Sequence, residues 1–149
     1  MTNREALSLA EACASTLYER DAASQAMGMR LLSVAPGAAR VGMSVRADML
    51  QGVGTCHGGH LFALADSAFA FACNTYNEVT VAIGCSIDYV APAHLGDTLT
   101  AQATEQSRSG RTGNYDVRIE NQNGQLIALF HGKSYKVRGT LLDEESLHE

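Results

Sequence analysis

The stretch GGHLFALADSAFAFACN, residues 58–74, decides how this chain folds. Its apolar side chains cover every side of a helix, and such a helix is typical of the interior of a domain rather than its surface. Asn74 is a signal for the C-terminal end of a helix. We therefore predict a buried helix that begins at Gly58 or Gly59 and runs to about Asn74.

The segments around this helix predict a chain rich in β-structure. Residues 3–20 place apolar side chains at three- and four-residue spacing, which predicts an N-terminal helix. Alternating apolar and polar side chains predict strands, and these are expected at residues 27–34, 39–45, 79–89, 98–104, 115–119 and 126–137. A polar turn is expected over residues 107–113. Hairpin-length links make the later strands antiparallel, so the fold class is α+β, with one antiparallel sheet wrapped around the apolar helix.

The length of 149 residues fits a single domain over residues 1–149, with an acidic tail at about residues 143–149 that is expected to fray. Charged residues make up 18% of the chain, below the roughly 25% that is typical of soluble domains. A monomer so poor in charge has difficulty covering its surface. The composition therefore predicts a buried interface between subunits.

Several classes of protein are excluded by the same sequence. No apolar stretch approaches the roughly 18 residues of a membrane helix, and the polar N-terminus is unlike a secretory signal. The net charge of −5 argues against a dedicated nucleic-acid binder. The four cysteines stand in apolar contexts without CxxC spacing, which predicts reduced thiols in a cytoplasmic protein; they are Cys13, Cys56, Cys73 and Cys85.

Asp66 is the sharpest chemical feature, because the predicted buried helix has almost no other polar side chain. Burying a carboxylate costs several kcal/mol unless it is paired or neutralised. One interpretation is a structural carboxylate that accepts hydrogen bonds from nearby backbone or serine groups. The other is a general base or nucleophile in a dry cleft, where desolvation raises its pKa. The helix alone does not decide between them.

A glycine-rich loop, residues 51–57, leads into the helix, and the segment GVGTCHGG at 52–59 spans the junction. Glycines let a ligand approach backbone N–H groups, and a helix N-terminus suits an anion or a developing oxyanion; the alternative is an ordinary flexible loop. Gly58 and Asp66 are eight residues apart, which is about 12 Å along a helix. One carbonyl therefore cannot touch both groups of one chain. We predict a dimer with a composite site, in which Asp66 comes from an antiparallel, two-fold-related helix.

Other kinds of site have weaker support. Cys56, His57 and His60 lack a recognised metal-ligand spacing, so we expect no metal and no cofactor, with His57 lining the site instead. No GxSxG motif is present, and no serine, histidine and aspartate stand in the order of a serine hydrolase. Cys56 makes a poor nucleophile with His57, because the side chains of adjacent residues rarely form the hydrogen bond that is needed.

Positive charge gathers between Arg108 and Arg138, where six basic residues against two acidic ones give +4. One interpretation is a solvated strand surface that aids solubility. The other is a patch for a phosphorylated ligand. In that case Arg108 and Arg111, predicted in one polar turn, are the best phosphate contacts, with Thr112 beside them.

Five segments carry a resemblance to a known family: GTCHGGHLFALADSAFAFACN at 54–74, IDY at 87–89, GDTLTA at 96–101, YDV at 115–117 and ALFHGKS at 128–134. Over nearly all of residues 12–141 the chain resembles the hotdog-fold acyl-CoA thioesterases of the PaaI, or phenylacetic acid degradation, type. The resemblance implies a homodimer with a continuous sheet, often paired as a dimer of dimers into a homotetramer. It places the active site between subunits.

The resemblance also implies roles for individual residues. The Gly58 N–H polarises the thioester carbonyl, and Asp66 of the other subunit activates water or attacks the carbonyl. His57 lines the pocket, Gly59 and Ser67 contact the substrate, and a Ser or Thr on the next strand lends support, for which Ser86 is the candidate here. Arg20 stands where the family usually has Asn, and cannot replace it in kind.

The expected function is hydrolysis of an acyl-CoA thioester, either phenylacetyl-CoA or hydroxyphenylacetyl-CoA, with CoA as part of the substrate rather than a cofactor. Phe62, Phe69 and Tyr89 are candidates for an acyl pocket, although core packing explains them equally well. One alternative is a hydratase or dehydratase on the same fold. The other is a non-catalytic acyl-CoA-binding module, for which a desolvated carboxylate has little use.

Overall fold

The computed structural model describes residues 1–143; the rest of the expected frayed tail, residues 144–149, lies outside them. The elements follow in the order α1 (Asn3–Glu19), α2 (Ala22–Ala26), β1 (Arg30–Ala35), β2 (Ala38–Ser44), the 3₁₀ helix η1 (Ala47–Met49), α3 (Gly58–Cys73), β3 (Thr80–Tyr89), β4 (Thr98–Ser109), β5 (Thr112–Glu120) and β6 (Leu126–Lys136). None of the helices in this part of the chain is long and apolar enough to span a membrane.

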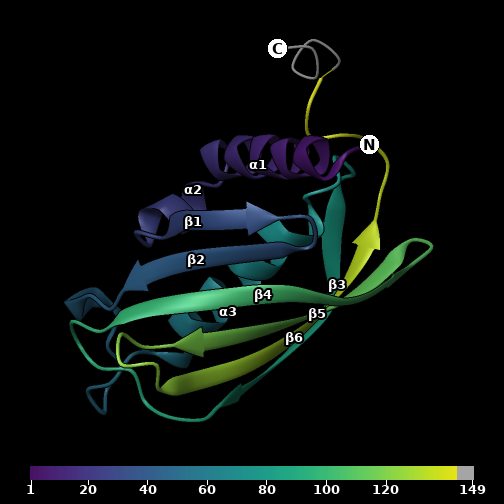
Figure 1. Cartoon of the computed structure of the whole chain (residues 1–149). Coiled ribbons are helices and arrows are strands. Elements are labelled where there is room, and N and C mark those ends of the chain that lie inside the picture. Colours follow the sequence, from purple (N-terminus) through teal and green to yellow (C-terminus); the bar gives the residue numbers. More distant parts are fainter. Residues whose placement is uncertain (144–149) are drawn as a thin grey trace.

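The six strands form one sheet in the order β1-β2-β4-β5-β6-β3, and every neighbouring pair is antiparallel. Helix α3 packs across one face of the sheet, with contacts to all six strands, while α1 lies alongside β1 (Figure 1). Strand β3 follows α3 in the chain but pairs with β6 at the far edge. This arrangement confirms the predicted α+β architecture of an antiparallel sheet wrapped around a central helix.

The core lies between α3 and the sheet. Phe69 and Phe71 of α3 are each 1% exposed, and Phe69 packs against the ring of Tyr115 at a centroid distance of 5.5 Å. Gly132 of β6 makes room for this packing, because a Cβ there would lie 2.9 Å from the Phe69 ring. Close packing of the helix against the sheet fixes the direction in which the rest of α3 points.

Two details differ from the prediction. The short helices α2 and η1 were not expected, because elements of five and three residues leave no periodic signal. The predicted turn over residues 107–113 is wrong: β4 runs to Ser109 and β5 starts at Thr112, which pair across the two-residue turn Gly110–Arg111. Gly110 supplies the positive φ of 60° in this turn. Arg108 therefore belongs to a strand, not to a turn.

Candidate active site

The N-terminus of α3 holds the first part of the candidate site. His57 is the N-cap residue, and its Nδ1 accepts a hydrogen bond of 2.8 Å from the Gly59 N–H. The Gly58 N–H has no acceptor among residues 1–143, as is usual for the first residue of a helix. Tyr89 donates its hydroxyl to the Gly58 carbonyl at 2.9 Å, which fixes the peptide on the other side of Gly58. The donor that stays available for a ligand is therefore the Gly58 N–H, not that of Gly59.

The loop before α3 is braced by side-chain and backbone hydrogen bonds. Gln51 accepts hydrogen bonds from the Val53 and Gly54 N–H groups and donates to Thr55 Oγ1 at 2.7 Å. The His57 N–H donates to the Met49 carbonyl at 2.8 Å. Sequence reasoning missed Gln51, because a lone amide in a glycine-rich loop carries no motif. These bonds fix where the helix N-terminus points.

Asp66 lies near the middle of α3, between the fully buried Ala65 and the half-buried Ser67. Burial raises the pKa of its carboxyl group above the usual value, and the negative charge of Asp21 raises it further. A hydrogen bond from the Cys85 thiol, with Sγ 3.9 Å from Asp66 Oδ1, acts in the opposite direction. A half-buried carboxyl group with a raised pKa is suited to take up a proton during a reaction.

Ser67 contacts a neighbouring element. Its Oγ lies 2.8 Å from Ser24 Oγ on α2, and Ser24 donates its hydroxyl to Asp21 at 2.6 Å. Arg20, which stands where the family usually has Asn, is the exposed C-cap of α1. No sequence pattern pointed to Ser24 or Asp21, because the short helix that carries them was not predicted.

Strand β3 supplies Cys85 to the site, not Ser86. Successive side chains on a strand point to opposite faces, and Cys85 points toward Asp66. Ser86 is paired with His131 and lines a pocket on the other face of the sheet. The expectation that Ser86 supports Asp66 is therefore wrong within one chain.

Phe69 belongs to the core, since it is 1% exposed and packs on Tyr115 and Phe130. Phe62 is half-buried, with its ring 5.4 Å from that of Phe130. Tyr89 is 53% exposed beside Gly58. Of the three aromatic candidates for an acyl pocket, Tyr89 is the one that the structure places at the helix N-terminus.

Helix α3 is continuous from Gly58 to Cys73, so the predicted separation of Gly58 and Asp66 stands: eight residues, or about 12 Å along the axis. A thioester carbonyl is far too small to bridge that gap. One chain therefore contains both the Gly58 N–H and the Asp66 carboxylate, but these two groups cannot both contact one substrate carbonyl.

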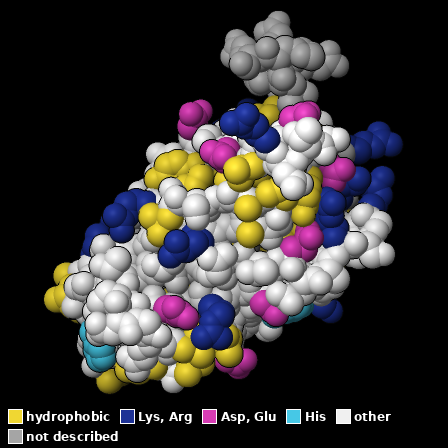
Figure 2. All heavy atoms as spheres, in the orientation of Figure 1, with side chains coloured by type: hydrophobic (Ala, Val, Ile, Leu, Met, Phe, Trp, Pro, Cys, Tyr) yellow, Lys and Arg dark blue, Asp and Glu magenta, His cyan; other side chains and the backbone are white. Residues whose placement is uncertain are grey.

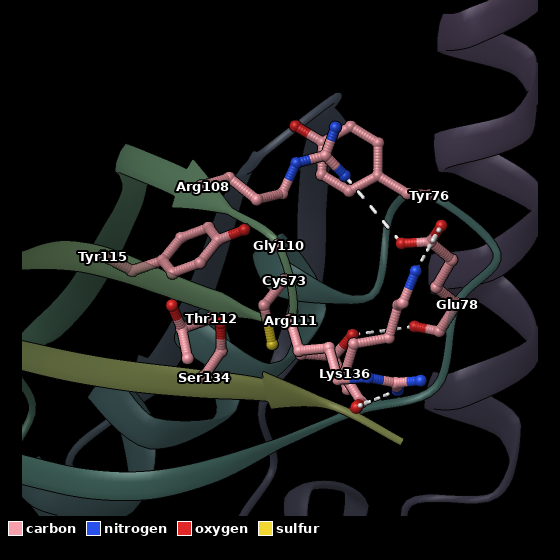
Figure 3. Close-up of a pocket in the computed structure, with 11 residues that line it drawn as sticks. Cys73, Tyr76, Glu78, Arg108, Gly110, Arg111, Thr112, Tyr115, Ser134 and Lys136 are labelled. Carbon is pink, nitrogen blue, oxygen red and sulfur yellow. Dashed lines mark hydrogen bonds and ion pairs between the residues drawn. The ribbon is translucent and has the colours of Figure 1, made fainter. Parts of the chain in front are cut away.

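A basic pocket of about 310 Å³ lies at the opposite end of α3, beside Cys73, and brings together Arg108, Arg111 and Thr112 (Figure 3). The Arg108 guanidinium stacks 3.5 Å from the centroid of the Tyr76 ring. It also lies 4.0 Å from the Glu78 carboxylate.

Two further contacts order the rim of this pocket. Lys136 Nζ is 3.3 Å from Glu78, and Arg111 donates to the Lys136 carbonyl at 3.2 Å. Arg108 is thus held by acidic and aromatic neighbours, whereas the Arg111 guanidinium makes no ion pair among the described residues. Figure 2 shows acidic and basic side chains interspersed over the visible face rather than one large basic surface.

Comparison with known proteins identifies the family. Residues 53–128, which include all of α3, match the sequence model of the thioesterase superfamily. The chain belongs to this superfamily and is a thioester hydrolase with the hotdog fold. Across residues 1–143, no three His, Cys, Asp or Glu side chains lie close enough to hold a metal ion.

Within the family, the chain is 47% identical over 131 residues to the acyl-coenzyme A thioesterase PaaI of Escherichia coli K12, covering 88% of this chain and 94% of that protein. The solved structure of E. coli PaaI, from the phenylacetic acid degradation operon, superimposes with a TM-score of 0.89 at 46% identity, over 90% of this chain and 97% of that one. The expected resemblance to the PaaI type is confirmed.

Two other solved structures are also similar. A mutant of the phenylacetic acid degradation protein PaaI from Thermus thermophilus has a TM-score of 0.74 at 45% identity, over 76% of this chain and 97% of that one. The smu.793 protein from Streptococcus mutans, bound to acetyl CoA, has a TM-score of 0.72 at 26% identity, over 75% and 90% of the two chains.

The cap at the start of α3 yields a first prediction. His57→Ala removes the acceptor of the Gly59 N–H and should lower the free energy of unfolding by about 1 kcal/mol. His57→Asn should keep most of that stability, because Asn is a favourable N-cap residue. Urea titration of the two variants measures the difference. An equal loss in both would contradict the capping role.

Proposed function

We propose that this thioester hydrolase cleaves the CoA thioester of phenylacetate or hydroxyphenylacetate. The observation that carries the proposal is the Gly58 N–H, which no described residue accepts, at the start of the same apolar helix that holds Asp66, whose pKa is raised. The acyl class is supported by the E. coli relative, a CoA thioesterase from a phenylacetic acid degradation operon. The exposed ring of Tyr89 beside Gly58 offers an aromatic surface for such an acyl group.

In the proposed reaction the thioester carbonyl oxygen accepts a hydrogen bond from the Gly58 N–H at the positive end of the α3 dipole. Asp66 of the partner subunit either takes a proton from the attacking water or attacks the carbonyl carbon itself. The carbon–sulfur bond then breaks, and the CoA sulfur leaves as a thiolate that gains a proton. The carboxylic acid is the other product, formed directly or by hydrolysis of the acyl-Asp66 intermediate.

The composite site requires a dimer, and the exposed edge of the sheet supports one. Strand β3 is ten residues long and pairs with β6 alone among the described strands. Its side chains Val81 and Ile83 are 44% and 58% exposed. A long edge strand with exposed apolar side chains favours pairing with another chain. Pairing of two β3 edges about a two-fold axis gives a continuous sheet with antiparallel α3 helices; the dimer of dimers stays a prediction.

The basic pocket has a consistent place in such a dimer. When Asp66 of one subunit faces Gly58 of the other, Cys73 lies seven residues further along its helix, about 10 Å beyond the reacting carbonyl. Cys73 lines the basic pocket. We therefore place the CoA phosphates at Arg111 and Thr112, in the subunit that supplies Asp66, with Arg108 shaping the rim.

The two alternative functions have less support. Membership of the thioesterase superfamily favours hydrolysis over hydration or simple binding. Enoyl-CoA and hydroxyacyl-CoA assays test the hydratase alternative directly. Tight binding of acyl-CoA without release of a free thiol would support the binding module.

The proposed role of Asp66 predicts opposite effects on activity and stability. Asp66→Asn should abolish thiol release from phenylacetyl-CoA. Because burial raises the pKa of Asp66, the ionised carboxylate costs stability above that pKa, and an amide does not. The variant should therefore melt at a higher temperature than the native chain at neutral pH, and the difference should vanish in acid, where the carboxyl group is protonated in both folded and unfolded states. Unchanged kcat would refute the mechanism.

The composite site predicts complementation between two inactive variants. Gly58→Pro removes the N–H donor. Proline is well tolerated at the first position of a helix, and the extended backbone of His57 is compatible with a proline after it. A refolded equal mixture with Asp66→Asn should recover activity at about a quarter of the sites, since half of the random dimers carry one intact site.

Gly58→Ala is the matched control for that mixture, because it adds the same Cβ beside Tyr89 but keeps the N–H. It should retain more activity alone than the Pro variant. A mixture of the Pro and Asn variants with no gain in activity, despite dimers of normal mass, would exclude a site shared between subunits.

The proposed phosphate site predicts a change confined to KM. Arg111→Ala should raise KM for phenylacetyl-CoA about tenfold, the effect of losing a charge-assisted hydrogen bond. It should leave short thioesters that lack the nucleotide unchanged. Arg118→Ala is the control, since this arginine pairs with Glu120 and lies outside the basic pocket. Equal effects of Arg111→Ala on both substrates would remove the phosphate assignment.

A further inference from the structure

A chain of hydrogen bonds leads from Asp21 to the neighbour of Asp66. Asp21 is the N-cap residue of α2 and accepts a hydrogen bond of 2.9 Å from the Ser24 N–H. Its second carboxylate oxygen accepts from the Ser24 hydroxyl at 2.6 Å, and Ser24 Oγ lies 2.8 Å from Ser67 Oγ. We propose that Asp21 is a positioning residue for the Asp66 segment of α3: through Ser24 it holds Ser67, the next residue after Asp66, and so sets its carboxylate near the proposed catalytic group. The inference rests on the proposed role of Asp66 in hydrolysis.

The hydroxyl directions in this chain follow from the carboxylate. An ionised carboxylate can only accept hydrogen bonds, so the Ser24 hydroxyl proton points to Asp21. Ser24 Oγ is then an acceptor toward Ser67, and the Ser67 hydroxyl proton points to Ser24. Ser24 is 2% exposed, so bulk water does not compete for these bonds. Asp21 is thereby tied through Ser24 of α2 to Ser67 of α3.

The charges around Asp66 show what Asp21 contributes. Among the described residues, the titratable groups that interact with Asp66 are Asp21 from the α1–α2 connection, Cys85 from β3 and Cys73 from α3 itself. The two thiols are neutral at neutral pH, because burial raises the pKa of each above its usual value. Asp21 is thus the one charged group of this set. A like charge makes Asp66 a stronger base than burial alone does.

Asp21→Asn tests the inference with little disturbance of the fold, because Asn also caps helices well. Without the negative charge, Asp66 ionises at lower pH. The acidic limb of the kcat/KM profile should move to lower pH, and activity on that limb should rise about threefold. On the plateau, activity should stay level or fall, since Asp66 is a weaker base. A structural defect would lower kcat/KM at every pH, so a rise in kcat/KM that is confined to acidic pH distinguishes the loss of charge from such a defect.

Two further variants complete the test. Glu19→Gln makes the same charge change two residues away, on the exposed last residue of α1, and should leave the profile in place. Ser24→Ala removes the hydroxyl that ties Asp21 to Ser67 but keeps the Asp21 charge, so the acidic limb should move in the same direction as in Asp21→Asn and no further. If the limb stays in place in Ser24→Ala while it moves in Asp21→Asn, the hydroxyl chain does not hold Asp21 and the positioning role fails.

A direct titration of Asp66 separates this inference from the proposed function. Carbon-13 NMR of labelled aspartate, assigned with Asp66→Asn, follows the Asp66 carboxyl group without any substrate. A lower pKa of Asp66 in Asp21→Asn supports the coupling even when the kinetic profile is unmoved, and that combination would overturn Asp66 as the base. An Asp66 titration identical to that of the native chain would overturn the coupling, whatever the activity.

Discussion

The free energy cost of holding an ionisable carboxylate in an apolar helix is the constraint on which the rest of the structure depends. Helix α3 is apolar on every side, and the sheet covers one of its faces along its length. Asp66 breaks that pattern at its middle, where burial raises its pKa and the Cys85 thiol offers only a long hydrogen bond. A helix chosen for stability alone would carry an apolar or amide side chain there. The proposed role of Asp66 in hydrolysis gives this carboxylate a reason.

The geometry of the same helix explains why one subunit cannot bring Gly58 and Asp66 to the same substrate carbonyl. Its first N–H, at Gly58, has no acceptor within residues 1–143, and its carboxylate lies two turns further on. Rigid helical geometry keeps these two groups apart, so under the proposed function a second copy of the helix, running in the opposite direction, brings them to one carbonyl. The proposed place for that copy is the exposed β3 edge, beside which Cys85 meets Asp66. The low fraction of charged residues, 18%, agrees with a subunit interface at this edge.

Sequence patterns predicted what depends on periodicity. The central helix, the N-terminal helix and the antiparallel strands were predicted to within a few residues, because burial imposes periods of 3.6 and 2 on apolar side chains. Asp66 and Gly58 stood out as departures from those patterns. Ser24, Asp21 and Gln51 did not, since their contacts depend on short elements or on one loop. Ser86 was a candidate only because the resemblance implied a Ser or Thr on that strand, whereas the alternation of the pleat decides which side chain faces α3, and that side chain is Cys85.

The two ends of α3 differ in the kind of contact they offer a substrate. At the Gly58 end the site presents a backbone N–H and the exposed ring of Tyr89, without an ion pair among the neighbours described. At the Cys73 end the basic pocket contains Arg111, and Glu78 pairs there with Arg108 and Lys136. An acyl-CoA has the same division, with an apolar acyl group at the thioester and phosphates at the other end of a long arm. Under the proposed function, antiparallel pairing of α3 sets the Gly58 end of one subunit beside the Cys73 end of its partner. One two-fold axis then completes the reacting centre and aligns the phosphate pocket with it.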